Sequence, residues 1–77
     1  MKTNLEDLQK IVNVAFRENI KITEDTKRKS LPEWDSMNHI ALISELEDFY
    51  KISFTVGEIE QIDSVKILRK ILEKKLL

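Results

Sequence analysis

Apolar residues recur at steps of three and four in three separate stretches of this chain, and that periodicity limits the fold more than any other feature. The first stretch predicts an amphipathic helix from about residue 4 to 18. Its apolar stripe consists of Leu5, Leu8, Val12, Ala15 and Phe16. Gly57 and Pro32 are the only residues of their kinds, which argues against a β fold with many turns. The sequence therefore predicts an all-α domain.

Capping signals set the expected bounds of the first helix. Thr3 and Glu6 fit a capping box at its start, and Asn19 is the expected stop. Residues 23–34 show no convincing period, and Pro32 forbids a continuous helix through them. We therefore expect a long loop after the first helix, which is unusual in a domain of this size and indicates function.

Two apolar residues of this loop, Leu31 and Trp34, are the expected anchors that hold it against the helices. The run Lys27-Arg28-Lys29 is expected to be an exposed part of the loop. A nucleic-acid patch is disfavoured because no aromatic residues are interleaved and the chain as a whole is not basic.

The second helix is predicted to begin at Asp35, whose carboxylate suits an N-cap, with Ser36 in its first turn. This helix is the most apolar and should be central. The apolar stripe expected along it is Met37, Ile40, Ile43 and Leu46, widened by Ala41, Leu42, Phe49 and Tyr50. His39 is expected to be exposed near the helix start.

The remaining residues predict an extended connector, a short helix and a final helix. Ile52, Phe54 and Val56 should turn their side chains inward along the connector. A second capping box opens the short helix at Thr55 and Glu58. The final helix should be capped at Asp63-Ser64, with the stripe Val65, Leu68, Ile71, Leu72 and Leu76. The predicted fold is a single domain over residues 1–77, a small bundle of three longer helices and one short helix, with a long loop between helices 1 and 2.

Composition excludes several classes of function. The chain has no cysteine and one histidine, so no disulfide and no metal site are expected. No apolar run approaches the ~20 residues of a membrane span. The first residues lead directly into an amphipathic pattern, so we expect no signal peptide and a cytoplasmic location. A monomer is expected because the apolar stripes are no larger than one bundle needs. A hydrolase built on Ser36 and His39 is disfavoured because a single glycine and so small a domain offer neither an oxyanion hole nor a substrate pocket.

The charges are unevenly distributed, although the net charge is only -1. No lysine or arginine lies between Lys29 and Lys51. The acidic residues of that interval are Glu33, Asp35, Glu45, Glu47 and Asp48. A local acidic segment suits a basic partner surface, although a solvated helix face gives the same pattern.

Asp35-Ser36-Met37 opens a hydrophobic helix that continues as Ile-Ala-Leu-Ile-x-x-Leu-Glu-x-x-Tyr, and in this context the chain resembles the acyl carrier protein family. The resemblance covers nearly the whole chain in length, helix order and loop placement. It implies that the protein is not an enzyme and that Ser36 receives a covalent phosphopantetheine from coenzyme A. It further implies acyl groups carried as thioesters for fatty-acid or specialised biosynthesis, with part of the bound chain shielded between the helices.

The partners that the resemblance implies are a phosphopantetheinyl transferase, an acyl-loading ligase or transferase, and downstream synthases with basic docking patches. The candidate contacts are Asp35, Met37, Asn38, Glu45, Glu47 and Asp48. Nucleic acid and a membrane span are not expected.

Several residues depart from the family pattern. Met37 replaces the usual leucine, and Asn38 and Ala41 stand where acids are common. Trp34 before the motif looks more like discrete carriers of specialised pathways or stand-alone aminoacyl carriers. We expect it to pack the loop on the bundle and to crowd the root of the arm. An aminoacyl or peptidyl carrier and an unmodified helical interaction module of the same fold therefore remain alternatives.

Overall fold

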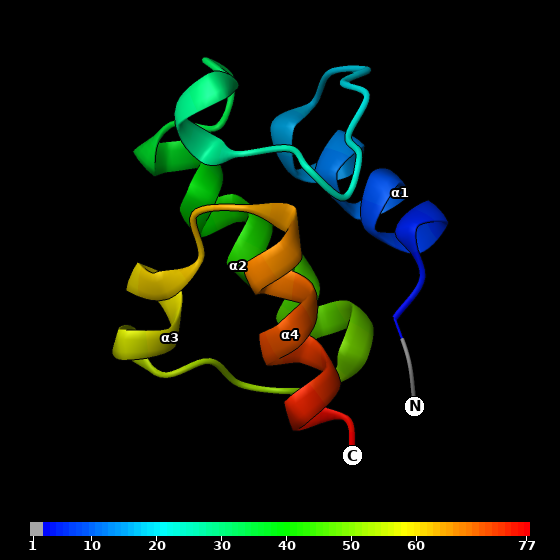
Figure 1. Ribbon diagram of the computed structural model, residues 1–77, viewed down its shortest axis with the longest axis vertical. Helices are drawn as coiled ribbons and strands as arrows, with labels where there is room; N and C mark the ends of the chain where they lie inside the picture. Colours follow the sequence, from blue (N-terminus) through cyan, green and yellow to red (C-terminus); the bar gives the residue numbers. More distant parts are fainter. Residues whose placement is uncertain (1–2) are drawn as a thin grey trace.

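The computed structural model describes residues 3–77, so Met1 and Lys2, where the expectation of no signal peptide begins, lie outside the described part. Over residues 3–77 the fold consists of four α-helices and one 3-10 turn (Figure 1). Their bounds are α1 Leu5–Phe16, η1 Arg28–Ser30, α2 Ser36–Tyr50, α3 Val56–Gln61 and α4 Val65–Lys75. The predicted bundle of three longer helices and one short helix is confirmed, as is the long loop between α1 and α2.

The predicted capping box of α1 is wrong. Asn4 is the N-cap, and its side chain accepts the amide proton of Asp7 at 2.8 Å. Thr3 is instead buried, and its hydroxyl and carbonyl oxygens accept hydrogen bonds from Arg69 of α4 at 3.1 and 2.9 Å. The helix also ends before Asn19, because Arg17 takes the left-handed conformation with φ of 58°.

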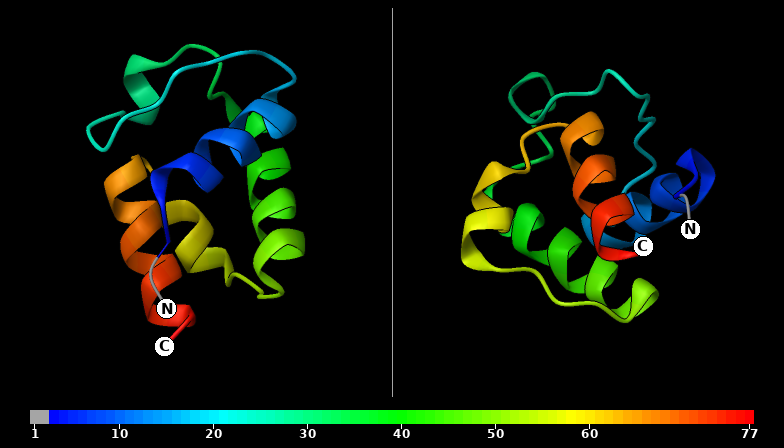
Figure 2. Two further views of the ribbon diagram at one scale, coloured as in Figure 1. Left: turned by 90° about the vertical axis from the view of Figure 1, so that its right-hand side faces the viewer. Right: turned by 60° about the horizontal axis from the view of Figure 1, so that its bottom comes forward.

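The core lies where α1, α2 and α4 face one another, with α3 and the connector closing one side (Figures 1 and 2). The side chains that are fully buried there are Leu8, Leu42, Leu46, Ile62, Val65, Leu68 and Leu72. Phe54 of the connector is buried and Ile52 partly so, as predicted, but Val56 is exposed because it opens α3 instead of ending the connector. The capping box of Thr55 and Glu58 is confirmed.

The core-facing side of α2 differs from the predicted stripe. Met37 is 82% exposed and Ile40 59% exposed, whereas the buried residues are His39, Leu42, Ile43 and Leu46. Phe49, also assigned to the stripe, is exposed. The reason is geometric. With 3.6 residues per turn, each step of three falls about 60° short of a full turn, so a run of such steps winds round the helix. A pattern of i, i+3, i+4 and i+7 stays on one face, and residues 39, 42, 43 and 46 follow it.

The loop of residues 17–35 crosses one end of the bundle, from the end of α1 to the start of α2 (Figure 1). Ile20 and Ile22 are buried. Trp34 is 4% exposed, and its ring centroid lies 6.3 Å from that of Phe16 on α1. The expectation that Trp34 packs the loop against the helices is confirmed. Lys27 and Lys29 are exposed, as expected, whereas Arg28 is partly buried. The backbone of Lys27 also forms an isolated antiparallel bridge with Ser64.

Candidate functional site

Ser36 is the first residue of α2 and its side chain is exposed. Asp35 before it is the N-cap, and its carboxylate accepts the amide proton of Asn38 at 2.8 Å. The carbonyl oxygen of Asp35 accepts the amide proton of His39 at 2.8 Å and begins the helical ladder. The cap therefore fixes the backbone at Ser36 and leaves its hydroxyl accessible to another protein.

The backbone of residues 33 and 34, just before Ser36, takes part in three hydrogen bonds. The Asn38 side chain donates to the carbonyl oxygen of Glu33 at 2.7 Å. The carbonyl oxygen of Trp34 accepts from Nε of Arg28 at 3.2 Å, and the Trp34 amide donates to Leu31 at 2.9 Å. Because hydrogen bonds hold the backbone on both sides of the serine, its position at the helix start is preorganised.

A buried hydrogen-bonded chain lies beneath this turn, and it corrects the expectation that His39 is exposed. His39 is 4% exposed, and its Nδ1 accepts from Nε1 of Trp34 at 2.8 Å. The ring proton then lies on Nε2, which donates to the carbonyl oxygen of Ile59 in α3 at 2.9 Å. These two hydrogen bonds join the loop, α2 and α3. The sequence carried a signal for it, because residue 39 shares a helix face with the core residues 42, 43 and 46.

This arrangement does not support hydrolysis by Ser36 and His39. Both ring nitrogens of His39 are bound to other groups within the bundle, whereas the serine faces solvent. A general base must reach the hydroxyl whose proton it removes. Within residues 3–77, no group of three or more metal-ligating side chains comes together.

The predicted partner residues fall into two groups in the structure. Met37 and Asp48 are exposed, and Glu45 is half-buried. The polar groups of the other three take part in the fold: Asp35 caps α2, Asn38 holds the loop, and the Glu47 carboxylate accepts the amide proton of Phe54 at 2.8 Å. Ile40, which we expected in the core, is exposed one turn after Ser36. Apolar surface beside the serine is thus larger than predicted.

The start of α2 offers a favourable place for a negatively charged substituent. The first amide groups of a helix have no partner within it, and the helix dipole is positive at that end. The amides of Asn38 and His39 already donate to Asp35. The amides of Ser36 and Met37 come before them and precede the first backbone hydrogen bond of the helix. A phosphate on the serine oxygen fits this environment, although the Asp35 carboxylate next to it opposes part of the gain.

The shifted pKa values lie away from this turn. A hydrogen bond from Lys75, with Nζ 2.7 Å from Oε1, and one from the Thr55 amide lower the pKa of Glu58. Burial raises the pKa of Tyr50, with a further contribution from the charge of Asp7. Neither shift provides an acid or a base at Ser36.

No described helix is both long and apolar enough to cross a membrane. No protein-family model matches the chain, and no curated protein matches it. Among solved structures, the chain is similar to a holo acyl carrier protein from Geobacter metallireducens that was determined by solution NMR. The two share 36% sequence identity over 94% of this chain and 84% of that one, with a TM-score of 0.82. With this identity over almost its entire length, the chain belongs to the acyl carrier protein family.

Proposed function

We propose that Oγ of Ser36 is the attachment point of a phosphopantetheine arm and that the protein carries acyl groups on it. The observation that supports this most directly is an exposed serine at the first position of a capped 15-residue helix, in a chain whose solved relative is a holo acyl carrier protein. When attached, the arm supplies a terminal thiol that holds the acyl group as a thioester.

The chain's own residues present the serine and stabilise the product. In the loading step the Ser36 oxygen bonds to the phosphorus next to pantetheine, and the bond from that phosphorus to the bridging oxygen of the pyrophosphate breaks. Adenosine 3′,5′-bisphosphate leaves with the bridging oxygen, and a base of a separate transferase takes the hydroxyl proton. Asp35 and Asn38 hold the turn in which this happens. The helix start then stabilises the phosphodiester charge.

Partner enzymes are proposed to contact the exposed side of α2 near Ser36. Met37 and Ile40 provide apolar contacts there, while Glu45 and Asp48 provide negative charge further along the helix. This surface suits the transferase, an acyl-loading enzyme and synthases with basic docking patches. Charges at the rim of such a transient interface mainly affect the rate of encounter and its dependence on salt.

Intact-mass measurement tests the attachment. Apo protein incubated with coenzyme A and a broad-specificity phosphopantetheinyl transferase should gain one arm, and Ser36→Ala should gain none. Ser44→Ala is the matched control, because Ser44 is an exposed serine on the same helix and its loss should leave loading intact. An unchanged mass with several transferases, or loading of Ser36→Ala, would refute the proposal.

The cargo is a separate question from the attachment. Loading the holo protein with fatty acids or with amino acids by matching adenylating ligases distinguishes an acyl carrier from an aminoacyl carrier. We propose acyl cargo, in keeping with the family, and a cytoplasmic location remains a prediction from the sequence. An interaction module that needs no arm predicts instead that Ser36→Ala keeps its biological activity.

A further inference from the structure

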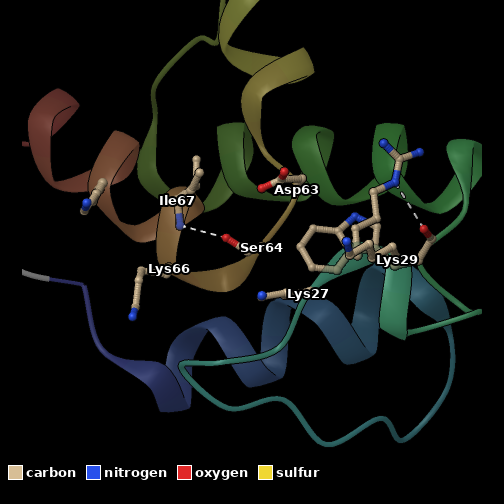
Figure 3. A pocket seen from close by; sticks show the side chains of 9 residues that line it. Lys27, Lys29, Asp63, Ser64, Lys66 and Ile67 are labelled. Atoms are coloured by element: carbon tan, nitrogen blue, oxygen red, sulfur yellow. Dashed lines mark hydrogen bonds between the residues drawn. The ribbon is translucent and has the colours of Figure 1, made fainter.

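A groove of about 820 Å³ lies between the loop and the start of α4, and its charge is opposite to that of the acidic α2 (Figure 3). Five cationic residues line it: Lys27, Arg28, Lys29, Lys66 and Lys70. Asp63 is the acidic residue on its lining. In the sequence these cations form two runs separated by more than thirty positions.

Backbone hydrogen bonds bring the two runs together. The Arg28 amide donates to the carbonyl oxygen of Asp63 at 2.8 Å, and the Val65 amide donates to that of Thr26 at 3.0 Å. Figure 3 shows Lys27 and Lys29 on the loop, Lys66 and Ile67 at the start of α4, and Asp63 and Ser64 on the connection between α3 and α4. The groove is therefore built by the fold itself and does not depend on the loop alone.

The four lysines of the groove are exposed and have no acidic partner at ion-pair distance within residues 3–77. Arg69, the neighbouring cation on α4, is by contrast paired with Glu24 and Glu73. Lys66 and Lys70 stand four apart on one helix, a spacing at which like charges destabilise. Unbalanced positive charge in a concave site raises the local concentration of anionic partners.

The lining also has an apolar part. Ile67 is 36% exposed, and the indole of Trp34 forms part of the groove wall. Trp34 itself is almost fully buried, so its face is not available for stacking on a base. An exposed apolar side chain, Ile67, flanked by lysines matches a protein segment in which an apolar side chain lies between carboxylates, and it matches nucleic acid less well.

We propose that this groove, defined by Lys27, Lys29, Lys66, Ile67 and Lys70, is a second docking surface that binds an acidic, partly apolar segment of a partner protein. None of its lining residues belongs to α2, so the carrier has two surfaces of opposite charge. Partners with basic patches and partners with acidic segments would then bind to different parts of the same small domain.

The test uses a synthetic peptide of alternating glutamate and leucine as the probe, added to ¹⁵N-labelled full-length protein. Amide shifts should move around Lys27–Lys29 and Lys66–Lys70, and binding should weaken steeply as salt is raised. The double variant Lys66→Glu/Lys70→Glu should lower the affinity by at least about ten-fold. Its matched control, Lys21→Glu/Lys74→Glu, changes the net charge equally at exposed sites outside the groove and should retain the affinity.

Loading of the arm on Ser36 should be unchanged in both double variants, so failure here is distinguishable from failure of the proposed function. Retained amide dispersion in the variants shows that they are folded. The proposal is overturned if the peptide shifts residues elsewhere or if the control loses affinity equally. It is also overturned if the groove binds oligo(dT), phosphatidylglycerol vesicles or a second copy of this chain in preference to the peptide.

Discussion

Replacing His39 by leucine tests whether the buried chain from Trp34 through His39 to Ile59 holds the loop on the bundle. The substitution leaves the Trp34 Nε1–H and the Ile59 carbonyl without partners. An orphaned buried polar group costs about 1–3 kcal/mol, and the partly buried Ile59 carbonyl should be at the lower end. We therefore expect a loss of about 2–4 kcal/mol in the free energy of unfolding.

That loss is large for this chain. A domain of 77 residues is expected to be stable by roughly 4–12 kcal/mol, from about 0.05–0.15 kcal/mol per residue. The midpoint of thermal unfolding should fall by on the order of 10–30 °C. Urea unfolding followed by circular dichroism at constant m-value measures the change, and the fluorescence of Trp34, the single tryptophan, reports on the site directly.

A double-mutant cycle isolates the hydrogen bond. In Trp34→Phe/His39→Leu neither partner remains, so the double variant should be more stable than the sum of the single losses predicts, by about 1–2 kcal/mol. Ser44→Leu puts leucine at an exposed position of α2 and should change stability by no more than about 0.5 kcal/mol. A loss below about 1 kcal/mol in His39→Leu, together with additive single effects, would refute the reasoning.

Three further changes test other parts of the fold. Asp35→Ala removes the cap on the Asn38 amide and should cost about 1 kcal/mol in urea unfolding, without changing the fold. Glu58→Gln tests the lowered pKa of Glu58. Because the folded pKa lies below the ordinary value of 4.5, the ionised Glu58 carboxylate stabilises the wild-type fold above pH 4.5, and this contribution is lost as the pH falls through the folded pKa. An acid titration should therefore show a smaller loss in the variant, and an identical loss would contradict the assigned contact with Lys75. Tyr50→Phe removes a buried hydroxyl that has no hydrogen-bond partner within residues 3–77, so neutral-pH stability should be unchanged or rise by up to about 1 kcal/mol. Because burial raises the pKa of Tyr50, wild-type stability should be lost as pH rises above its ordinary value of 10.0, and the variant should show less of that loss; a substantial destabilisation at pH 7 would contradict the assignment.

Local signals in the sequence were enough to place most elements. The start of α2 was predictable because Asp35 is a strong N-cap after a proline-containing loop, and both act within a few residues. The capping box of Thr55 and Glu58 and the cap at Ser64 were predictable for the same reason. The place of Ser36 at the helix start was predicted from the same cap, whereas its choice as the candidate attachment site came from the family resemblance.

The direction in which α2 faces was harder to predict, because apolar residues occur round most of its circumference. Met37 and Ile40 satisfied a spacing of three but lie outside the core, and His39 looked polar but lies within it. Burying a histidine is favourable only where partners satisfy both ring nitrogens. Those partners, Trp34 and Ile59, belong to other elements, so the local pattern did not reveal them.

The sequence by itself determined the helical class, the order of the helices, the long loop and the serine at the start of α2, because periodicity and caps act over a few neighbouring residues. The tertiary structure alone decided which sides of the helices are buried and which distant charges meet. Lys27 and Lys66 face one groove because the loop pairs with the residues that precede α4, and contacts between distant segments leave no periodic signal in the chain. The acidic residues of α2 are evident from the sequence, whereas the basic groove is evident only from the folded structure.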